Sequence, residues 1–308
     1  MKHAPSLLAL IMAGALAACS AETPDGADGT AESTMAETGT SDETTADMEP
    51  AASSPTLEDL VVGDQRPDGH ADRNQYRNPV ETLEFFGIEP DMTVVEVWPG
   101  GGWYAHILAP YLEQGGGDYI AAGFEIGDSE NARRSFENFQ SAMAGYGDVD
   151  FTVLSAGSDG IAPAGSADMV LTFRNVHNWM GGGFADKAFA DFYAALKPGG
   201  TLGVVEHRLP EDREQFGEGG YVKQSAVIAM AERAGFQFVE ASEINANPAD
   251  TADHPFGVWT LPPNNRSSNY GEEPDPEFDS SKYMEIGESD RMTLKFTKPV
   301  TADGAMLE

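Results

Sequence analysis

A run of β-branched residues that ends in three glycines constrains the fold more than any other part of this 308-residue chain. Residues 94–103 read VVEVWPGGGW. The β-branched half predicts a buried strand, and the glycines predict a turn whose backbone a ligand can approach closely. In an open α/β sheet such a turn precedes a helix, whose N-terminus can bind polar or anionic groups. Tight packing between strand and helix would also use glycines, so the pattern alone leaves both interpretations open.

From about residue 57 onward, the chain alternates between strand-like and helix-like segments. A Lys-Pro-Gly-Gly turn at 197–200 ends one predicted helix, and Gly235 ends another. Repeated strand–helix units predict an α/β fold of the Rossmann-like, doubly wound type, with a mostly parallel, seven-stranded sheet. The expected strands are 93–98, 119–124, 151–154, 169–173, 201–206, 236–241 and 292–297, and the expected helices are 103–112, 129–143, 184–196 and 221–234.

Residues 243–290 interrupt this alternation. The segment is rich in Pro, Asn, Asp and Gly, and it is long for a loop without secondary structure. Its aromatic and apolar residues favour a packed lid over a disordered segment. We therefore expect a lid-like insertion that closes over a pocket and brings Trp259 or His254 near the strand ends.

The N-terminal segment has the features of an export signal. A basic start precedes an apolar run at 7–18, which is short for a membrane span. Residues 16–19, LAAC, resemble the bacterial lipoprotein cleavage box, in which the cysteine becomes the lipidated first residue. Cys19 is the only cysteine, so no intrachain disulfide can form. The sequence predicts a signal peptide at 1–18 and lipidation of Cys19, and Ser20 favours retention at the outer membrane.

An acidic segment, 19–56, separates Cys19 from the predicted domain at 57–308. Positions 20–56 hold nine of the 51 acidic residues and no lysine or arginine. Such a composition cannot bury enough apolar surface to order itself, so it predicts a disordered tether. We expect the mature protein on the periplasmic side of the cell envelope, anchored by its lipid.

The net charge of the chain is −33, from 51 acidic and 18 basic residues. A nucleic-acid-binding protein needs a basic footprint, and electrostatic adhesion to anionic lipid needs basic residues as well. The composition therefore argues against both kinds of partner. We expect a monomer that acts on a small molecule.

The glycine turn belongs to a larger pattern. Glu96-x-x-x-Gly100-x-Gly102 and the later LKPGG turn resemble the class I S-adenosylmethionine-dependent methyltransferases. Over roughly 65–299, the chain resembles a group of exported bacterial proteins predicted to be methyltransferases, in the stretches PGGGWYAHILAPYL, VLTFRNVHNW, LKPGGTLGVVEHR, EINANPADTADHPFGVWTLPP and IGESDRM. The resemblance implies S-adenosyl-L-methionine as cofactor and an antiparallel last strand beside the sixth. It also implies that Glu96 and the loop Gly100, Gly101 and Gly102 hold the amino-acid end of the cofactor.

The chain departs from the family pattern in its loops. Where the family has a glycine two residues after the acid, this chain has Trp98, which either packs in the core or forms a wall of the cofactor pocket. The second predicted strand ends without the acid that takes the ribose hydroxyls in the family, so Glu125 is the candidate for that role. Asp159 stands where the family contacts the adenine amine, and a loop-capping aspartate is the alternative.

Polar residues follow the fourth and fifth predicted strands, at the expected mouth of the pocket. An imidazole titrates near neutral pH, so His177 and His207 are candidates for a general base. Asn175 is a candidate for contact with the cofactor and the reacting groups. For His177, the alternative is a loop histidine bonded to the backbone. Arg208 could hold a substrate carboxylate, and the alternative is an ion pair with Glu206.

A metal site is a further hypothesis for this region. His177, His207 and His254 with Glu206 are donors that Zn²⁺ accepts. No close ligand spacing supports such a site, so the sequence predicts none.

The resemblance implies methyl transfer by direct displacement at the sulfonium methyl, to a small molecule or an envelope component. RNVHNW differs from the Asn-Pro-Pro-aromatic motif of amino-methylating relatives, so nucleic-acid bases are not favoured as acceptors. Export raises two alternatives, because the cofactor is not known to be plentiful outside the cytoplasm. One is a catalytically inactive ligand-binding lipoprotein that keeps the fold. The other is a different reaction, such as hydrolysis, which no serine or cysteine nucleophile motif supports.

Overall fold

Strands joined by helices dominate the structure, a computed structural model that describes residues 55–214 and 219–300. The predicted signal peptide, Cys19 and residues 19–54 of the predicted tether lie outside the described residues. The strands are β1 (Thr93–Val97), β2 (Asp118–Gly123), β3 (Val149–Val153), β4 (Ala167–Phe173), β5 (Leu196–Leu209), β6 (Val222–Lys223), β7 (Gln237–Ser242) and β8 (Arg291–Thr297).

Seven of these strands form a continuous sheet in the order β3-β2-β1-β4-β5-β8-β7, and β6 pairs only with β5. The first five strands in this order run parallel to one another. By contrast, β8 runs antiparallel to both β5 and β7. The predicted doubly wound, mostly parallel sheet with an antiparallel last strand is confirmed, and the two-residue β6 is an addition to it. The winding reverses between β1 and β4, and this switch point is where such sheets form a crevice.

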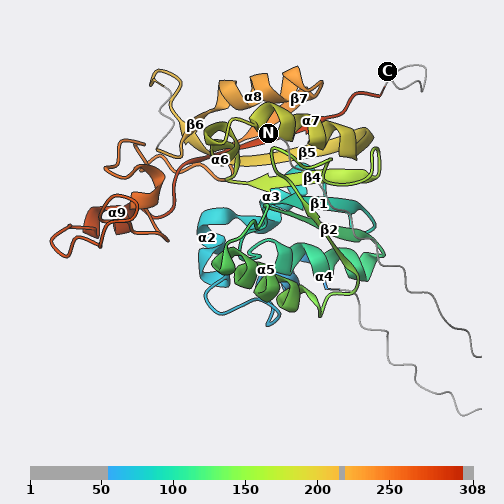
Figure 1. Cartoon of the computed structure of the whole chain (residues 1–308), viewed down its shortest axis with the longest axis horizontal. Helices are drawn as coiled ribbons and strands as arrows, with labels where there is room; N and C mark the ends of the chain where they lie inside the picture. Colours follow the sequence, from blue (N-terminus) through green and yellow to red (C-terminus); the bar gives the residue numbers. More distant parts are fainter. Residues whose placement is uncertain (1–54, 215–218, 301–308) are drawn as a thin grey trace, which may run out of the picture. The chain divides into compact units, whose positions relative to one another are not determined.

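Helices cover both faces of the sheet. Figure 1 shows α6, α7 and α8 on one side and α4 and α5 on the other. Val95 and Val97 pack under the first group, and Val94 packs under the second. Because side chains alternate along a strand, Glu96 lies on the same face as Val94. The helices are α1 (Leu57–Leu60), η1 (Ala71–Arg73), α2 (Asn74–Arg77), α3 (Pro79–Phe86), α4 (Ala105–Gly115), α5 (Glu130–Met143), α6 (Val176–Gly181), α7 (Ala185–Ala195), α8 (Gln224–Arg233), η2 (Gly257–Thr260) and α9 (Ser281–Ile286).

The helical segment before β1 was not among the predicted elements. Thr56 and Asp59 form a capping box at the start of α1. Pro79 occupies the start of α3, and Gly87 ends it in the left-handed region at φ 80°. Between α1 and α3, η1 carries Arg73 and α2 carries Arg77, and both arginines line a pocket at the strand ends.

The insertion at 243–290 contains only two short helices, η2 and α9. In Figure 1 its α9 lies at the far left, away from the helices that cover the sheet. Another part of the insertion, Val258, Trp259 and residues 261–264, lines the pocket at the strand ends. Within 55–214 and 219–300, no helix is long and apolar enough to cross a membrane.

Candidate active site

A pocket of about 390 Å³ lies at the carboxyl ends of β1 and β4. Its volume falls in the range of small-molecule sites. Five parts of the chain meet around it: the η1–α2 segment, the glycine turn, the start of α6, the end of β5 and the insertion. The residues discussed below that line it are Arg73, Arg77, Glu96, Trp98, Gly100, Gly101, Trp103, Arg174, Asn175, His177, His207, Trp259, Glu288 and Ser289.

The three glycines of the turn have two different environments. Gly100 and Gly101 are exposed and line the pocket, and a Cβ added at either would meet no atom within 4 Å. Gly102 is buried at φ 82°, and a Cβ there would lie 3.1 Å from the Phe139 ring and 3.5 Å from that of His106. Gly102, which the resemblance groups with Gly100 and Gly101 at the cofactor, does not line the pocket. A side chain there would press on α4 and α5 instead.

Trp98 has both of the environments that the sequence left open. Its ring lines the pocket and also packs edge-on against Trp179, with 5.9 Å between ring centroids. The indole N–H donates to the Leu154 carbonyl at 3.1 Å. Its backbone adopts φ 52°, which is unusual for a residue with a bulky side chain. The left-handed turn at Trp98 ends β1 and directs the chain toward Gly100.

Glu96 is buried at the base of the pocket. Its carboxylate accepts a 2.6 Å hydrogen bond from the Tyr119 hydroxyl. Burial raises the pKa of Glu96 to about 7, although the Tyr119 hydrogen bond and the Arg174 charge oppose the shift. Near neutral pH, this carboxyl can therefore exchange a proton when a charged ligand arrives.

The raised pKa of Glu96 predicts a pH-dependent stability. Between pH 4.5 and about 7 the unfolded chain loses this proton while the folded protein keeps it, so stability falls as pH rises through that window. The Gln variant cannot ionise, and its amide oxygen can still accept from Tyr119. Relative to wild type, Glu96→Gln should gain about 3 kcal/mol between pH 4 and pH 8. Urea unfolding at both pH values measures this difference, and parallel stability curves for the two proteins would contradict it.

Asn175 joins the ends of β1 and β4. Its buried side-chain amide donates to the Val97 carbonyl at 2.9 Å and approaches the Trp98 carbonyl at 3.4 Å and the Thr172 hydroxyl at 3.3 Å. These contacts hold the turn after β1 against the turn after β4. The side chain lines the pocket, but its amide N–H groups are directed at the protein.

His177 and His207 lie on either side of the buried Glu206. The Nδ1 of His177 is 3.1 Å from Glu206 Oε1, and the backbone N–H groups of His177 and His207 donate to the same carboxylate at 3.3 and 2.8 Å. His207 Nδ1 is 2.5 Å from the Ser289 hydroxyl. Burial, reinforced by repulsion from His177, lowers the pKa of His207 well below its usual value. His207 is therefore neutral at physiological pH, and Glu206 orients His177.

The same three residues form a group that could hold a metal ion, with one ligand atom from each within 4.8 Å of the others. The fourth residue of the metal hypothesis, His254, lies elsewhere. Its Nε2 is 2.8 Å from Asp250 Oδ1, and it lines a separate cavity beside Phe256.

Three other residues of the sequence analysis lie away from the pocket. Glu125 and Asp159 are exposed and do not line it. The expected ribose and adenine contacts therefore have no support in this arrangement. Arg208 pairs with Asp290 and Glu243, at 2.8 and 2.7 Å, rather than with Glu206.

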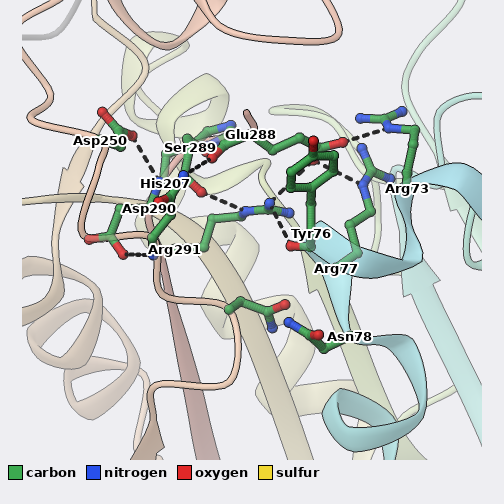
Figure 2. Close-up of polar contacts among 12 residues, drawn as sticks. Arg73, Tyr76, Arg77, Asn78, His207, Asp250, Glu288, Ser289, Asp290 and Arg291 are labelled. Carbon is green, nitrogen blue, oxygen red and sulfur yellow. Dashed lines mark hydrogen bonds and ion pairs between the residues drawn. The ribbon is translucent and has the colours of Figure 1, made fainter. Parts of the chain in front are cut away.

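An arginine cluster beside the pocket was missed in the sequence. Arg73, Arg77 and Arg291 converge on the single carboxylate of Glu288, at 2.6, 3.1 and 3.2 Å (Figure 2). Burial raises the pKa of Glu288, but the charges of Arg291 and Arg77 and a hydrogen bond from Arg73 hold it at about 2. We use the name arginine cluster for these three residues together with Arg174. The spacing of Arg73 and Arg77, one helical turn apart in a chain poor in basic residues, was the available signal.

Comparison with known proteins gives no family assignment. No family model and no curated protein sequence matches the chain. A SAM-dependent methyltransferase from Aquifex aeolicus is similar in structure, with 20% identity over 56% of this chain and 87% of that one, at a TM-score of 0.45. The [4+2]-cyclase SpnF has 15% identity over 78% and 86% of the two chains, at 0.48. Haemonchus contortus phosphoethanolamine N-methyltransferase 2, solved in complex with S-adenosyl-L-methionine, has 14% identity over 79% and 56%, at 0.45. At these identities and TM-scores, the similarity concerns the fold alone.

Proposed function

We propose that the pocket binds S-adenosyl-L-methionine and that the protein transfers its methyl group to a small-molecule acceptor. The observation that carries this proposal is the open backbone of Gly100 and Gly101 above the buried Glu96, at the switch point of the sheet. The residues present fit the cofactor. Glycines without side-chain neighbours leave room for its amino-acid part, and a carboxyl that ionises near pH 7 suits its ammonium. The ring of Trp98 offers an apolar wall on the same side.

The bound cofactor supplies an electrophilic methyl group, so the protein has to align the acceptor, take up a proton and exclude water. His177 suits the second task. With its Nδ1–H donated to Glu206, the other ring nitrogen is left to accept a proton from an acceptor hydroxyl or amine. Trp259 packs edge-on against the His177 ring, with 6.1 Å between centroids, and covers this side of the pocket.

Calorimetric titration of the mature protein with S-adenosyl-L-methionine and S-adenosylhomocysteine tests the proposal. We expect saturable, one-to-one binding of both. Titration in buffers with different ionisation enthalpies should also show proton release near pH 7, because the cofactor ammonium would favour the ionised form of Glu96. The absence of any binding would refute the proposal.

A second candidate is a ligand-binding protein that keeps the fold without catalysis. The exposed position of Glu125 favours it, because the pocket then lacks the acid that the family uses for the ribose. Cofactor binding that His177→Gln leaves unchanged, with no methylated product from any acceptor offered, would support this candidate. A His177-dependent product would support the enzyme.

We also propose that Cys19 is lipidated and that the protein is an envelope lipoprotein, on the basis of the LAAC box and the acidic segment after it. Cys19→Ser should abolish incorporation of labelled fatty acid and move the protein from the membrane fraction to the soluble fraction. The matched control is Ser20→Ala, which keeps the cysteine. A Cys19→Ser protein that still sediments with membranes after a salt wash would exclude this anchor.

A further inference from the structure

The arginine cluster holds more positive charge than its neighbours neutralise. Arg73, Arg77 and Arg291 share Glu288, whose two oxygens are both occupied. Arg291 is satisfied further by the carbonyls of Tyr76 and Ser289. Arg73 and Arg77 have no second acid among the described residues. A single carboxylate thus serves three guanidinium groups, in a chain whose net charge is −33.

Several nitrogen atoms of this cluster have no partner within the described residues. Arg77 is 98% buried, and its Nη1 makes no hydrogen bond. The Nη2 of Arg73 is also buried and makes no hydrogen bond. No hydrogen bond or ion pair joins the side chain of Arg174 to any described residue. Its charge nevertheless lies close to Arg77: burial, and next the repulsion from Arg174, lower the pKa of Arg77 to about 8. Buried charged donors without acceptors are costly and rare, so they indicate a missing acceptor.

The side chains that carry these donors surround the pocket, and they are held in place. Arg73, Arg77 and Arg174 all line it. Arg77 stacks on the Trp103 ring, with its Cζ 4.6 Å from the ring centroid, so the guanidinium is oriented before a ligand arrives. Arg174 adopts φ 65°, a left-handed conformation that turns the chain directly after β4. Backbone strain of this kind persists where surrounding structure enforces it, and it often marks ligand sites.

We propose that Arg73, Arg77 and Arg174 form a subsite for an oxyanion, a carboxylate or phosphate group carried by the methyl acceptor. The acceptor assignment rests on the proposed function. The chemistry fits, because guanidinium groups bind both oxyanions through paired N–H donors. The position fits as well: the glycine turn follows β1, whereas Arg174 follows β4 and Glu288 precedes β8, on the far side of the switch point. An acceptor anchored there would lie beside His177, three residues after Arg174.

The cofactor also carries a carboxylate, so the oxyanion bound by these arginines could belong to the cofactor and not to the acceptor. The experiment separates the two sources with S-adenosylhomocysteine, which has that carboxylate. The mature protein is titrated with inorganic phosphate and with succinate at constant ionic strength in sodium chloride, with and without saturating S-adenosylhomocysteine. The variants are Arg174→Gln, which removes no hydrogen bond or ion pair between side chains of the described residues, and Arg134→Gln, an exposed control on α5.

We expect saturable binding of at least one anion by wild type, and the same affinity in the presence of S-adenosylhomocysteine. Arg174→Gln should weaken anion binding about tenfold to a hundredfold, as the loss of a charged hydrogen bond does. Arg134→Gln should stay within twofold of wild type. Thermal unfolding of both variants without ligand checks that the fold is kept.

Three results would overturn the inference: no anion binding above the chloride background, an Arg174→Gln affinity equal to wild type, or competition between S-adenosylhomocysteine and the anion. Competition would assign the arginines to the cofactor's own carboxylate. If S-adenosylhomocysteine does not bind at all while anion binding still depends on Arg174, the oxyanion subsite stands and the methyl-transfer proposal falls. The two failures are therefore distinguishable.

Discussion

Gly102→Val is expected to destabilise the folded protein by about 3–5 kcal/mol and to lower its Tm by roughly 10 °C. Two costs add at this position. The backbone φ of 82° lies in the left-handed region, which a β-branched residue tolerates poorly. The first atom of the side chain would also lie 3.1 Å from Phe139, so α5 would have to shift before the branched methyl groups are placed. Differential scanning calorimetry measures the change.

Gly145→Val is the matched control for Gly102→Val. Gly145 is exposed, lies outside the left-handed region, and has open space around its Cβ position. Its substitution should move the Tm by no more than about 2 °C. A Gly102→Val protein as stable as this control would show that α5 does not pack on the turn as described.

Gly101→Val, unlike Gly102→Val, should leave the stability normal and strongly weaken cofactor binding. Gly101 is exposed, outside the left-handed region, and free of neighbours within 4 Å of its Cβ position, so the fold accommodates the side chain. Because Gly101 lines the pocket, the added atoms would occupy space that the proposed ligand needs. We expect the affinity for S-adenosylhomocysteine to fall at least a hundredfold, about 2.7 kcal/mol or more.

Two other glycine variants serve as controls for the Gly101 prediction. Gly145→Val should bind S-adenosylhomocysteine like wild type, and Gly102→Val, where it remains folded at low temperature, should retain most of its affinity. If Gly101→Val binds as tightly as wild type, the cofactor does not lie over this turn, and Glu96 loses its proposed partner as well.

The sheet was predictable from the sequence because its strands carry their own local signals. Four of the five residues at 93–97 are β-branched, and residues 94–97 are buried. The strand ends one residue earlier than expected because Trp98 turns left-handed. The prediction for β5 was too short. Pairing with β4 already begins at Leu196, before the Lys-Pro-Gly-Gly turn, and a register shift between Ala167 and Met169 absorbs the turn. Local propensity identifies the turn and cannot reveal pairing that continues through it.

The sequence contains a signal for helix α6 that the prediction of helices did not include. No helix is predicted over the stretch RNVHNW, whose polar residues are considered only as candidates for the site. Val176 and Trp179, three residues apart, are both fully buried, which is the spacing of one helical face. This short helix gives His177 its position on Glu206.

The pocket was predictable in part, for a reason that lies in topology. Residues that directly follow parallel strands meet at one edge of the sheet, so Trp98, Asn175 and His207 could be placed there from their positions in the sequence. The arginine cluster could not be placed in this way. Arg73 meets Glu288 across 215 positions of sequence, and no periodic pattern in either segment predicts that contact.

The arginine-lined pocket within a strongly acidic chain has a consequence for the rate of ligand capture. A field from a net charge of −33 draws cations toward the protein and slows the approach of anions, even where the final site is positive. S-adenosyl-L-methionine has a net positive charge, and the proposed acceptor has a negative one. Added salt screens this field, with a Debye length of about 10 Å at 0.1 M. The association rate of the acceptor should therefore rise with ionic strength while that of the cofactor falls, so that the salinity of the surroundings sets which of the two encounters is slower.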